Sequence, residues 1–169
     1  MAQIDGLMFF NGGAQAGASV QHRHLQIAPF DAPLLQALLP DAAADHAAQQ
    51  LARLPFAHAL VKFDSALPAS TDAAGARLHD AYQGCLEHCG LAPASDGRLP
   101  PYNLLATREC LLLVPRSRET WDDGDTRVSL NAMSFAGSIF VRDPALAPRI
   151  RQAGILRLLR SVTFPSHTP

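Results

Sequence analysis

Lysine is almost absent from this chain, and charge of either sign is scarce. Lys62 is the single lysine, charged residues make up 17% of the 169 positions, and the formal net charge is −1. A nearly neutral chain has little electrostatic attraction for nucleic acid or for an anionic membrane surface. We therefore expect neither as a partner.

Cysteine and long apolar runs are scarce too. Three cysteines do not suggest a framework of paired disulfides, so we expect a reducing, cytoplasmic location. No apolar run approaches the roughly 20 residues of a membrane-spanning helix. The first residues also lack the basic region of a signal peptide, so neither a membrane anchor nor secretion is indicated.

What is present is enough apolar sequence for one folded domain, with 48% hydrophobic residues. The clearest element is a helix, because apolar side chains recur at i, i+4, i+7, i+8 and i+11 and so share one helical face. These residues are Leu78, Tyr82, Cys85, Leu86 and Cys89. Gly90 is placed to end this helix.

The remaining patterns predict short strands and further helices. We expect strands at 6–10, 20–28 and 57–63, a hairpin from 102–107 and 109–114, and a second strand pair from 128–135 and 137–141. We expect helices at 31–39 capped by Asp31, at 41–54, and from Asp143 to 160 with a break near Gly154. Hairpins with segregated helices predict an α+β fold with a mainly antiparallel sheet.

The most informative segment places His22, His24 and Gln26 two residues apart after a glycine-rich turn. On a strand, this spacing would project all three side chains from one face. An imidazole flanked by a second imidazole and an amide suits nucleophilic attack on a phosphate, whose negative charge the neighbouring groups would hold. The pattern therefore favours nucleotidyl transfer.

Residues around the turn are candidates to hold a phosphate. Ser19 and Asn11 have hydrogen-bonding side chains, and the backbone N–H groups near Gly17 and Ala18 could form an anion-binding nest. The alternative is that Asn11 and Ser19 serve only the geometry of a tight turn. Lys62, like Arg108 and Arg116, is a further candidate to neutralise phosphate or else a solvated residue at a strand end.

Two other interpretations of these residues involve metal or packing. A His-x-His pair also occurs in zinc and cupin sites, but residues 25–30 contain no carboxylate to complete a cupin pattern. Cys85, His88 and Cys89 form an incomplete ligand set, and both cysteines belong to the apolar stripe. Core packing is therefore favoured for them. Trp121, in an acidic segment, is expected to be a surface hydrophobe.

Several segments resemble one protein family. Residues 11–13, 17–19 and 22–26 are similar to the signature of the transferase branch of the histidine-triad superfamily, nearest to the ATP adenylyltransferases, also called diadenosine tetraphosphate phosphorylases. Related uridylyltransferases typically have proline where this chain has Arg23, and the hydrolases have a third histidine in place of Gln26. Segments 101–105, 113–117 and 131–137 resemble the C-terminal region of the family.

The resemblance implies a mechanism and a set of ligands. It implies a nucleotidyl-histidine intermediate on His24, with His22 orienting the phosphate and Gln26 binding phosphoryl oxygens. It also favours Arg116 among the candidate cations. The implied reaction is phosphorolysis of diadenosine tetraphosphate to ATP and ADP, and the implied partners are diadenosine polyphosphates, ATP, ADP and phosphate. No tightly bound cofactor is implied, although a divalent cation could accompany the nucleotide.

One departure from the family concerns the position of the motif. In the family it lies in the middle of the protein, whereas ten residues precede Asn11 here. We therefore expect a histidine-triad-like sheet that lacks its N-terminal half, with a catalytic segment at 1–63 packed as one unit against a C-terminal region at 64–169. Open alternatives are activity alone, activity with an N-terminal fragment or a second copy, an inactive remnant, and a related sugar-nucleotide phosphorylase.

Overall fold

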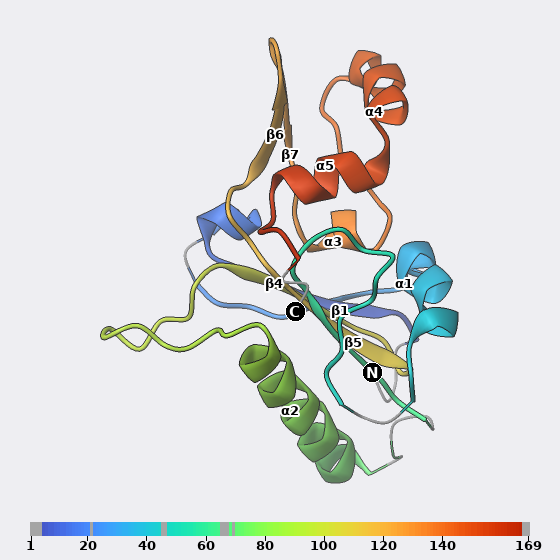
Figure 1. Ribbon diagram of the computed structural model, residues 1–169, viewed down its shortest axis with the longest axis vertical. Helices are drawn as coiled ribbons and strands as arrows, with labels where there is room; N and C mark the ends of the chain where they lie inside the picture. Colours follow the sequence, from blue (N-terminus) through green and yellow to red (C-terminus); the bar gives the residue numbers. More distant parts are fainter. Residues whose placement is uncertain (1–4, 21, 45–46, 65–67, 69, 167–169) are drawn as a thin grey trace.

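An antiparallel sheet forms the centre of the protein (Figure 1). The computed structural model describes residues 5–20, 22–44, 47–64, 68 and 70–166. Five strands run in the spatial order β2-β1-β4-β5-β3, and each pairs with its neighbours in antiparallel fashion. They are β1 (Leu7–Gly12), β2 (Gln26–Ala28), β3 (Ala59–Lys62), β4 (Tyr102–Ala106) and β5 (Cys110–Pro115).

Both faces of the sheet are buried, because side chains alternate between two apolar clusters. On one face Leu104 and Leu113 pack in the same cluster as Cys85 and Leu86 of helix α2 (Thr71–His88). On the other, Leu105 joins the cluster that contains α1 (Pro33–Leu38), α3 (Ala132–Phe135) and α5 (Ile155–Ser161). The sheet is thus the middle layer of the protein.

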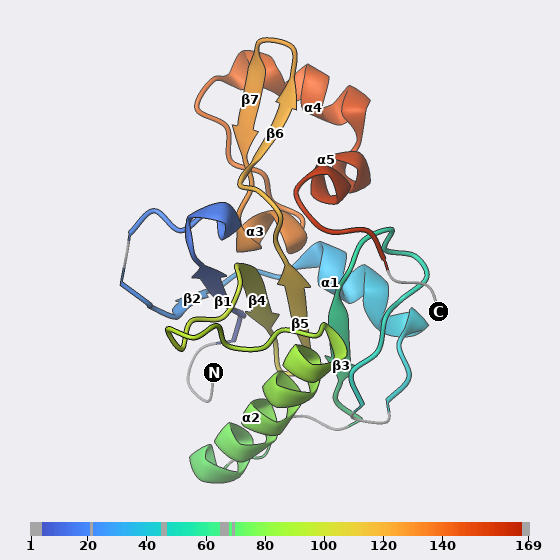
Figure 2. The same ribbon diagram turned by 60° about the vertical axis from the view of Figure 1, so that its left-hand side comes forward.

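A second, smaller sheet lies at one end of the molecule, whereas α2 extends toward the other end (Figure 2). It is a hairpin of β6 (Thr120–Asp123) and β7 (Thr126–Ser129). The 3-10 turn η3 (Pro144–Leu146) and helix α4 (Ala147–Ala153) follow in the chain. Arg149 of α4 donates to the Thr126 hydroxyl and pairs with Asp123 at 3.2 Å, which ties the helix to the hairpin.

Strongly periodic segments were predicted correctly. Helix α2, the β4–β5 hairpin and the break near Gly154 are confirmed. Asp143 accepts a hydrogen bond from the Ala145 backbone N–H at 2.9 Å and so begins η3 as expected. The α+β class with a mainly antiparallel sheet is also confirmed.

Four predicted elements are wrong in part. The strand at 20–28 forms only from Gln26, and helix α1 begins after Ala32, so Asp31 is not its cap. In the predicted helix at 41–54, the described residues 42–44 and 47–54 are not helical; Gln49 instead bridges to Leu60 of β3. Of the predicted strand pair, 128–135 contains the end of β7 and helix α3, and 137–141 forms no strand.

Candidate active site

A cavity of about 630 Å³ opens where β1 leads into the glycine-rich turn. It lies among β1, the 3-10 turn η1 (Ala14–Ala16), the segment that follows η1, and the loop before β4. Its wall is formed by Phe10, Asn11, Gly12, Gly13, Ala14, Ala18, Ser19, Val20, His22, Arg23, Arg98, Leu99 and Tyr102. Four of the candidate site residues therefore share this cavity: Asn11, Ala18, Ser19 and His22.

The glycine-rich turn is closed by its own backbone. The Gly17 N–H donates to the Ala14 carbonyl at 2.9 Å, and the Ala18 N–H donates to the Gly13 carbonyl at 3.2 Å. These two N–H groups are used inside the turn, so the anion nest expected from them is not formed. The correction follows from the tight 3-10 geometry of η1, which the glycine content alone does not specify.

Gly17 also fixes the turn against helix α3. Its φ of 81° lies in the left-handed region that glycine tolerates best. A Cβ at this position would lie 2.8 Å from Asn131 Cβ and 2.8 Å from the Leu130 carbonyl oxygen. A larger residue would therefore separate the turn from the start of α3.

The two histidines lie in the segment before β2 and are in contact with each other. Their ring centroids are 5.0 Å apart, and His24 Nδ1 lies 3.2 Å from the His22 carbonyl oxygen. Because a carbonyl can only accept, this contact requires the proton on Nδ1, and in the neutral imidazole the lone pair is then on Nε2. The geometry suits a nucleophile at Nε2.

His24 and Gln26 are not among the residues that line the cavity. His22 lines it, and His24 adjoins it through the ring contact with His22. Gln26 is exposed and begins β2, where it pairs with Phe9. The expected common face of three strand side chains is therefore not formed, since only Gln26 belongs to a strand.

Sequence reasoning missed two arginines of the cavity, Arg23 and Arg98. Arg23 occupies the position between the two histidines, a signal that we used only to compare families. Its charge acts on Tyr102, whose pKa is raised by burial and by the 2.8 Å hydrogen bond with Tyr82, and is lowered in part by Arg23. Arg98 lies in a loop without periodicity, so no pattern marked it.

The cavity also has an aromatic wall. Phe10 of β1 and Tyr102 of β4 are diagonal neighbours across the two strands, with ring centroids 5.5 Å apart. Aromatic faces of this kind can stack a nucleobase, while the arginines can pair with phosphate. The arrangement therefore offers one apolar surface and two cations to the same ligand.

Arg116 is not available to a ligand in this structure. Its side chain is buried and donates to the carbonyl oxygens of Val162, Arg118, Glu119 and Leu130 at 2.8–3.2 Å. Burial lowers the pKa of Arg116 to about 10, so the group remains charged at neutral pH. The predicted phosphate contact of Arg116 does not fit this arrangement, because its side chain already donates to groups within the fold.

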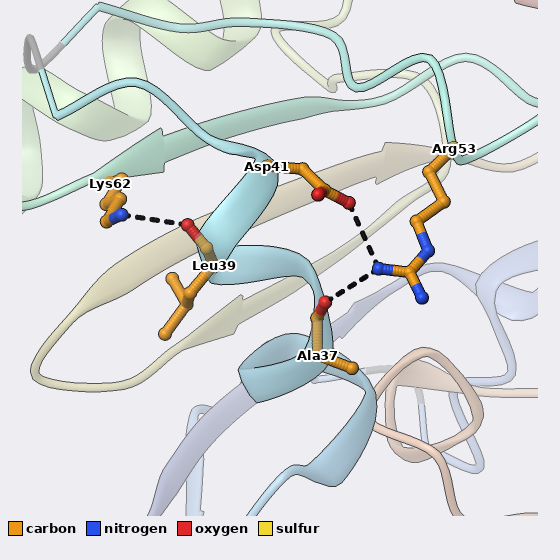
Figure 3. Close-up of polar contacts among 5 residues, drawn as sticks. All are labelled: Ala37, Leu39, Asp41, Arg53 and Lys62. Atoms are coloured by element: carbon orange, nitrogen blue, oxygen red, sulfur yellow. Dashed lines mark hydrogen bonds and ion pairs between the residues drawn. The ribbon is translucent and has the colours of Figure 1, made fainter.

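Lys62 lies far from the cavity as well. It belongs to β3, at the opposite edge of the sheet from β2. Its Nζ donates to the carbonyl of Leu39 at 2.8 Å and of Ala42 at 3.3 Å, next to the exposed pair of Arg53 and Asp41 (Figure 3). The lysine therefore holds the 3-10 turn η2 (Leu39–Asp41), and its predicted phosphate contact does not fit this arrangement.

The helical cysteines pack in the core. Burial raises the pKa of Cys85 to about 12, and Cys85 Sγ lies 3.7 Å from the Ala59 carbonyl oxygen. His88 is exposed on the same helix. Within the described part of the chain, no three histidine, cysteine or acidic side chains gather as a metal-binding group. Nor is any described helix long and apolar enough to cross a membrane.

Comparison with known proteins matches two consecutive parts of the sequence to family models. Residues 1–49 match the Ap4A phosphorylase N-terminal domain, and residues 52–165 match the ATP adenylyltransferase C-terminal domain. No curated protein matches the chain.

The fold is similar to that of yeast Ap4A phosphorylase Apa2. In the complex with Ap4A, the Apa2 chain has 23% sequence identity to this chain and a TM-score of 0.70. The match covers 96% of this chain and 55% of the Apa2 chain. The Apa2 complex with AMP has 20% sequence identity to this chain and a TM-score of 0.70, and the match covers 94% of this chain and 56% of the Apa2 chain. A third Apa2 structure has 21% identity and a TM-score of 0.74, and the match covers 96% of this chain and 57% of the Apa2 chain. The chain thus spans about half the length of these solved relatives.

Proposed function

Because the chain belongs to the ATP adenylyltransferase and Ap4A phosphorylase family, we propose that it carries a nucleotidyl-transfer site acting on diadenosine tetraphosphate. The reaction is phosphorolysis, in which phosphate and the dinucleotide give ATP and ADP. The observation that supports it best is the hydrogen bond between His24 Nδ1 and the His22 carbonyl, which favours the neutral tautomer whose lone pair is on Nε2.

The chemistry has two balanced displacement steps. In the first, the lone pair of His24 Nε2 attacks the α-phosphorus of the dinucleotide, an N–P bond forms, and the bridging P–O bond breaks to release ATP. In the second, a phosphate oxygen attacks the same phosphorus, a P–O bond forms, and the N–P electrons return to His24. ADP is the second product.

Other residues of the site have supporting roles in this proposal. His22 orients the phosphate, Gln26 hydrogen-bonds phosphoryl oxygens, and Ser19 donates to the leaving oxygen. Arg23 and Arg98 neutralise the polyphosphate, because both line the cavity. No tightly bound cofactor is needed, and a divalent cation enters with the nucleotide.

The edge of the sheet at β2 is a candidate surface for a partner. β2 is an edge strand, and Val20, Leu25 and Ile27 around it are exposed by 42%, 62% and 43%. An exposed edge with apolar side chains favours pairing with another chain. We propose that an N-terminal fragment of the family or a second copy binds there, while the segments at 1–63 and 64–169 pack as one unit. The cytoplasmic location stays a prediction.

The test is an assay of ATP and ADP formed from diadenosine tetraphosphate and phosphate. We expect wild-type turnover, alone or after addition of an N-terminal fragment, and a loss of at least about a thousand-fold in His24→Ala, since covalent catalysis is removed. Arg53→Gln, a change in an exposed ion pair that does not line the cavity, should retain full activity. Undiminished turnover by His24→Ala would overturn the proposal.

A trapping experiment checks the intermediate itself. Radiolabelled dinucleotide without phosphate should leave an acid-labile, alkali-stable label on wild type and none on His24→Ala. A remnant would give neither label nor turnover with the N-terminal fragment present. Turnover of a sugar nucleotide in place of the dinucleotide would indicate the related phosphorylase, and metal found in purified protein would favour the zinc interpretation of His22 and His24.

A further inference from the structure

The chain contains three asparagines, and all three gather beside the cavity. Asn11 lines the cavity, Asn103 is fully buried on the neighbouring strand, and Asn131 caps α3, whose first N–H bonds to Asn11. The buried Arg116 bonds to the Asn103 amide, which in turn bonds to the Asn11 amide. We propose that Arg116 is a positioning residue whose guanidinium, acting through Asn103, holds the Asn11 amide with its N–H donors toward a bound phosphate.

The direction of the hydrogen bonds from Arg116 through Asn103 to Asn11 follows from the chemistry of the Arg116 guanidinium. A guanidinium has donors and no acceptor. Arg116 Nη1 bonds to the Asn103 side chain, so Asn103 must present its carbonyl oxygen, Oδ1, to the arginine. The Nδ2 group of Asn103 then points the other way. An asparagine without such a partner could adopt either orientation of its amide.

The two N–H donors of Asn103 are both used. One donates to Asn11 Oδ1 at 2.8 Å, and the other donates to the Ala16 carbonyl at 2.9 Å. The first contact orients the Asn11 side chain, and the second holds the last residue of η1, next to Gly17. Arg116 therefore acts on both a side chain and a loop of the cavity.

Asn11 is held in one orientation by two donors. Its Oδ1 accepts from Asn103 Nδ2 and from the Ala132 backbone N–H at 2.9 Å. Its Nδ2 is consequently on the opposite branch of the amide. Asn11 lines the cavity and is partly exposed, so we assign this Nδ2 to the ligand side. A donor in a cavity that also holds Arg23 and Arg98 suits a phosphate oxygen.

Asn11→Asp tests the orientation with the least disturbance. The new carboxylate keeps an acceptor toward Asn103 and Ala132, and replaces the donor toward the cavity by an anionic oxygen. We expect AMP to bind about ten-fold or more weakly, because a hydrogen bond to a charged group is lost, while adenosine affinity is unchanged. Calorimetric titration with both probes measures this difference. Wild-type AMP affinity in Asn11→Asp would overturn the assignment.

Asn103→Asp tests the step from Asn103 to Asn11 while keeping the acceptor for Arg116. The carboxylate still accepts from Arg116, but it cannot donate to Asn11, whose amide should turn its Nδ2 inward and its Oδ1 toward the cavity. We expect AMP affinity to fall by a factor similar to that in Asn11→Asp. Asn11→Ala should then cause no further loss in the Asn103→Asp background. A full additional loss would show that Asn11 does not depend on Asn103.

This inference rests on the proposed function for the identity of its ligand. A measurement without ligand tests the orientation of the asparagine amides independently of the proposed reaction. Three asparagines give three pairs of side-chain amide signals in a selectively ¹⁵N-labelled sample. In wild type, the Asn103 protons should exchange slowly and the Asn11 protons rapidly. Asn103→Asp should slow the exchange of the Asn11 protons. Unchanged exchange there would overturn the proposal that Asn103 orients the Asn11 amide, even if the protein proves inactive. AMP binding without phosphorolysis would overturn only the proposed reaction.

Discussion

Histidines in this protein differ in what their two ring nitrogens contact, and that decides what each can do. His24 has one nitrogen held by a carbonyl, and its other nitrogen makes no hydrogen bond to any residue that the structure describes, which is the arrangement a nucleophile needs. His58 has both nitrogens engaged. Its Nδ1 lies 2.8 Å from the Phe56 carbonyl, and its Nε2 accepts from the Leu51 N–H at 2.9 Å. His58 is therefore a neutral, structural residue.

We predict that His58 makes the fold sensitive to mild acid. Burial lowers its pKa below the ordinary 6.5, so the unfolded chain takes up a proton at a pH where the folded chain does not. This contribution to stability is present above pH 6.5 and is lost as pH falls, by at most about 1.4 kcal/mol for each pH unit. Urea unfolding at pH 7.5 and 5.5 measures it. His58→Gln should show a smaller change between the two pH values, and an equal change would contradict the prediction.

The three thiols should be inert in the folded protein. Burial raises the pKa of Cys85 and Cys89 to about 12 and that of Cys110 to about 11. At pH 8 the thiolate fraction is then on the order of a thousandth or less, and the thiolate is the reactive form. Ellman's reagent should react slowly with native protein and rapidly in guanidinium chloride. Rapid labelling of the native protein would contradict this assignment of all three to the core.

Among the elements, those with strong periodicity could be predicted from sequence. The stripe on α2 shows which of its side chains are buried, and the short apolar runs of β4 and β5 are typical of strands buried on both faces. The segment at 41–54 is alanine-rich and favours helix locally, yet Gln49 bonds to both backbone groups of Ala43 and bridges to Leu60. Such contacts join distant residues, and local propensity does not contain them.

The candidate site likewise contains residues that the sequence could identify and residues whose surroundings only the fold determines. The motif marked His22, Ser19 and Asn11, which the structure places at one cavity. Lys62 was marked by its charge, and Arg116 by its charge and its place in a segment that resembles the family. Only the fold determines whether a cation faces a ligand or a backbone carbonyl. Trp121 was likewise expected at the surface because acidic residues follow it, but it is buried against the main cluster. A short polar stretch does not reveal what packs over it.

Helix α3 depends on its first residues more than longer helices do. Asn131 Oδ1 accepts from the Met133 N–H at 3.0 Å, and the Ser134 hydroxyl accepts from the Asn131 N–H at 3.3 Å. We predict that Asn131→Ala lowers the free energy of unfolding by about 0.5–2 kcal/mol. Ser70→Ala at the start of α2 is the matched control, since its cap is longer at 3.5 Å and should contribute less. Urea unfolding of both variants measures the two losses in the free energy of unfolding. An equal or larger loss in Ser70→Ala would contradict the prediction.

For the molecule as a whole, the order of strands predicts a single unfolding unit. β1 comes from the first segment and lies between β2 and β4, while β3 closes the far edge beside β5. We predict that the fluorescence of Trp121 and the far-ultraviolet circular dichroism change together in urea, as in a two-state transition. Residues 1–63 expressed alone should lack the dichroism of a sheet. Two separate transitions, or a folded fragment, would contradict this prediction.

The pairing of β1 with β4 has a consequence for how the protein is made. Asn11 and Asn103 are 92 positions apart and adjacent in the sheet. During synthesis β1 has no partner on its inner side until β4 has left the ribosome, so the glycine-rich turn and the histidines stay unassembled while α2 already can fold. Contacts between such distant positions form slowly. Translation speed, and chaperones that shield an unpaired strand, should therefore govern the yield of folded protein.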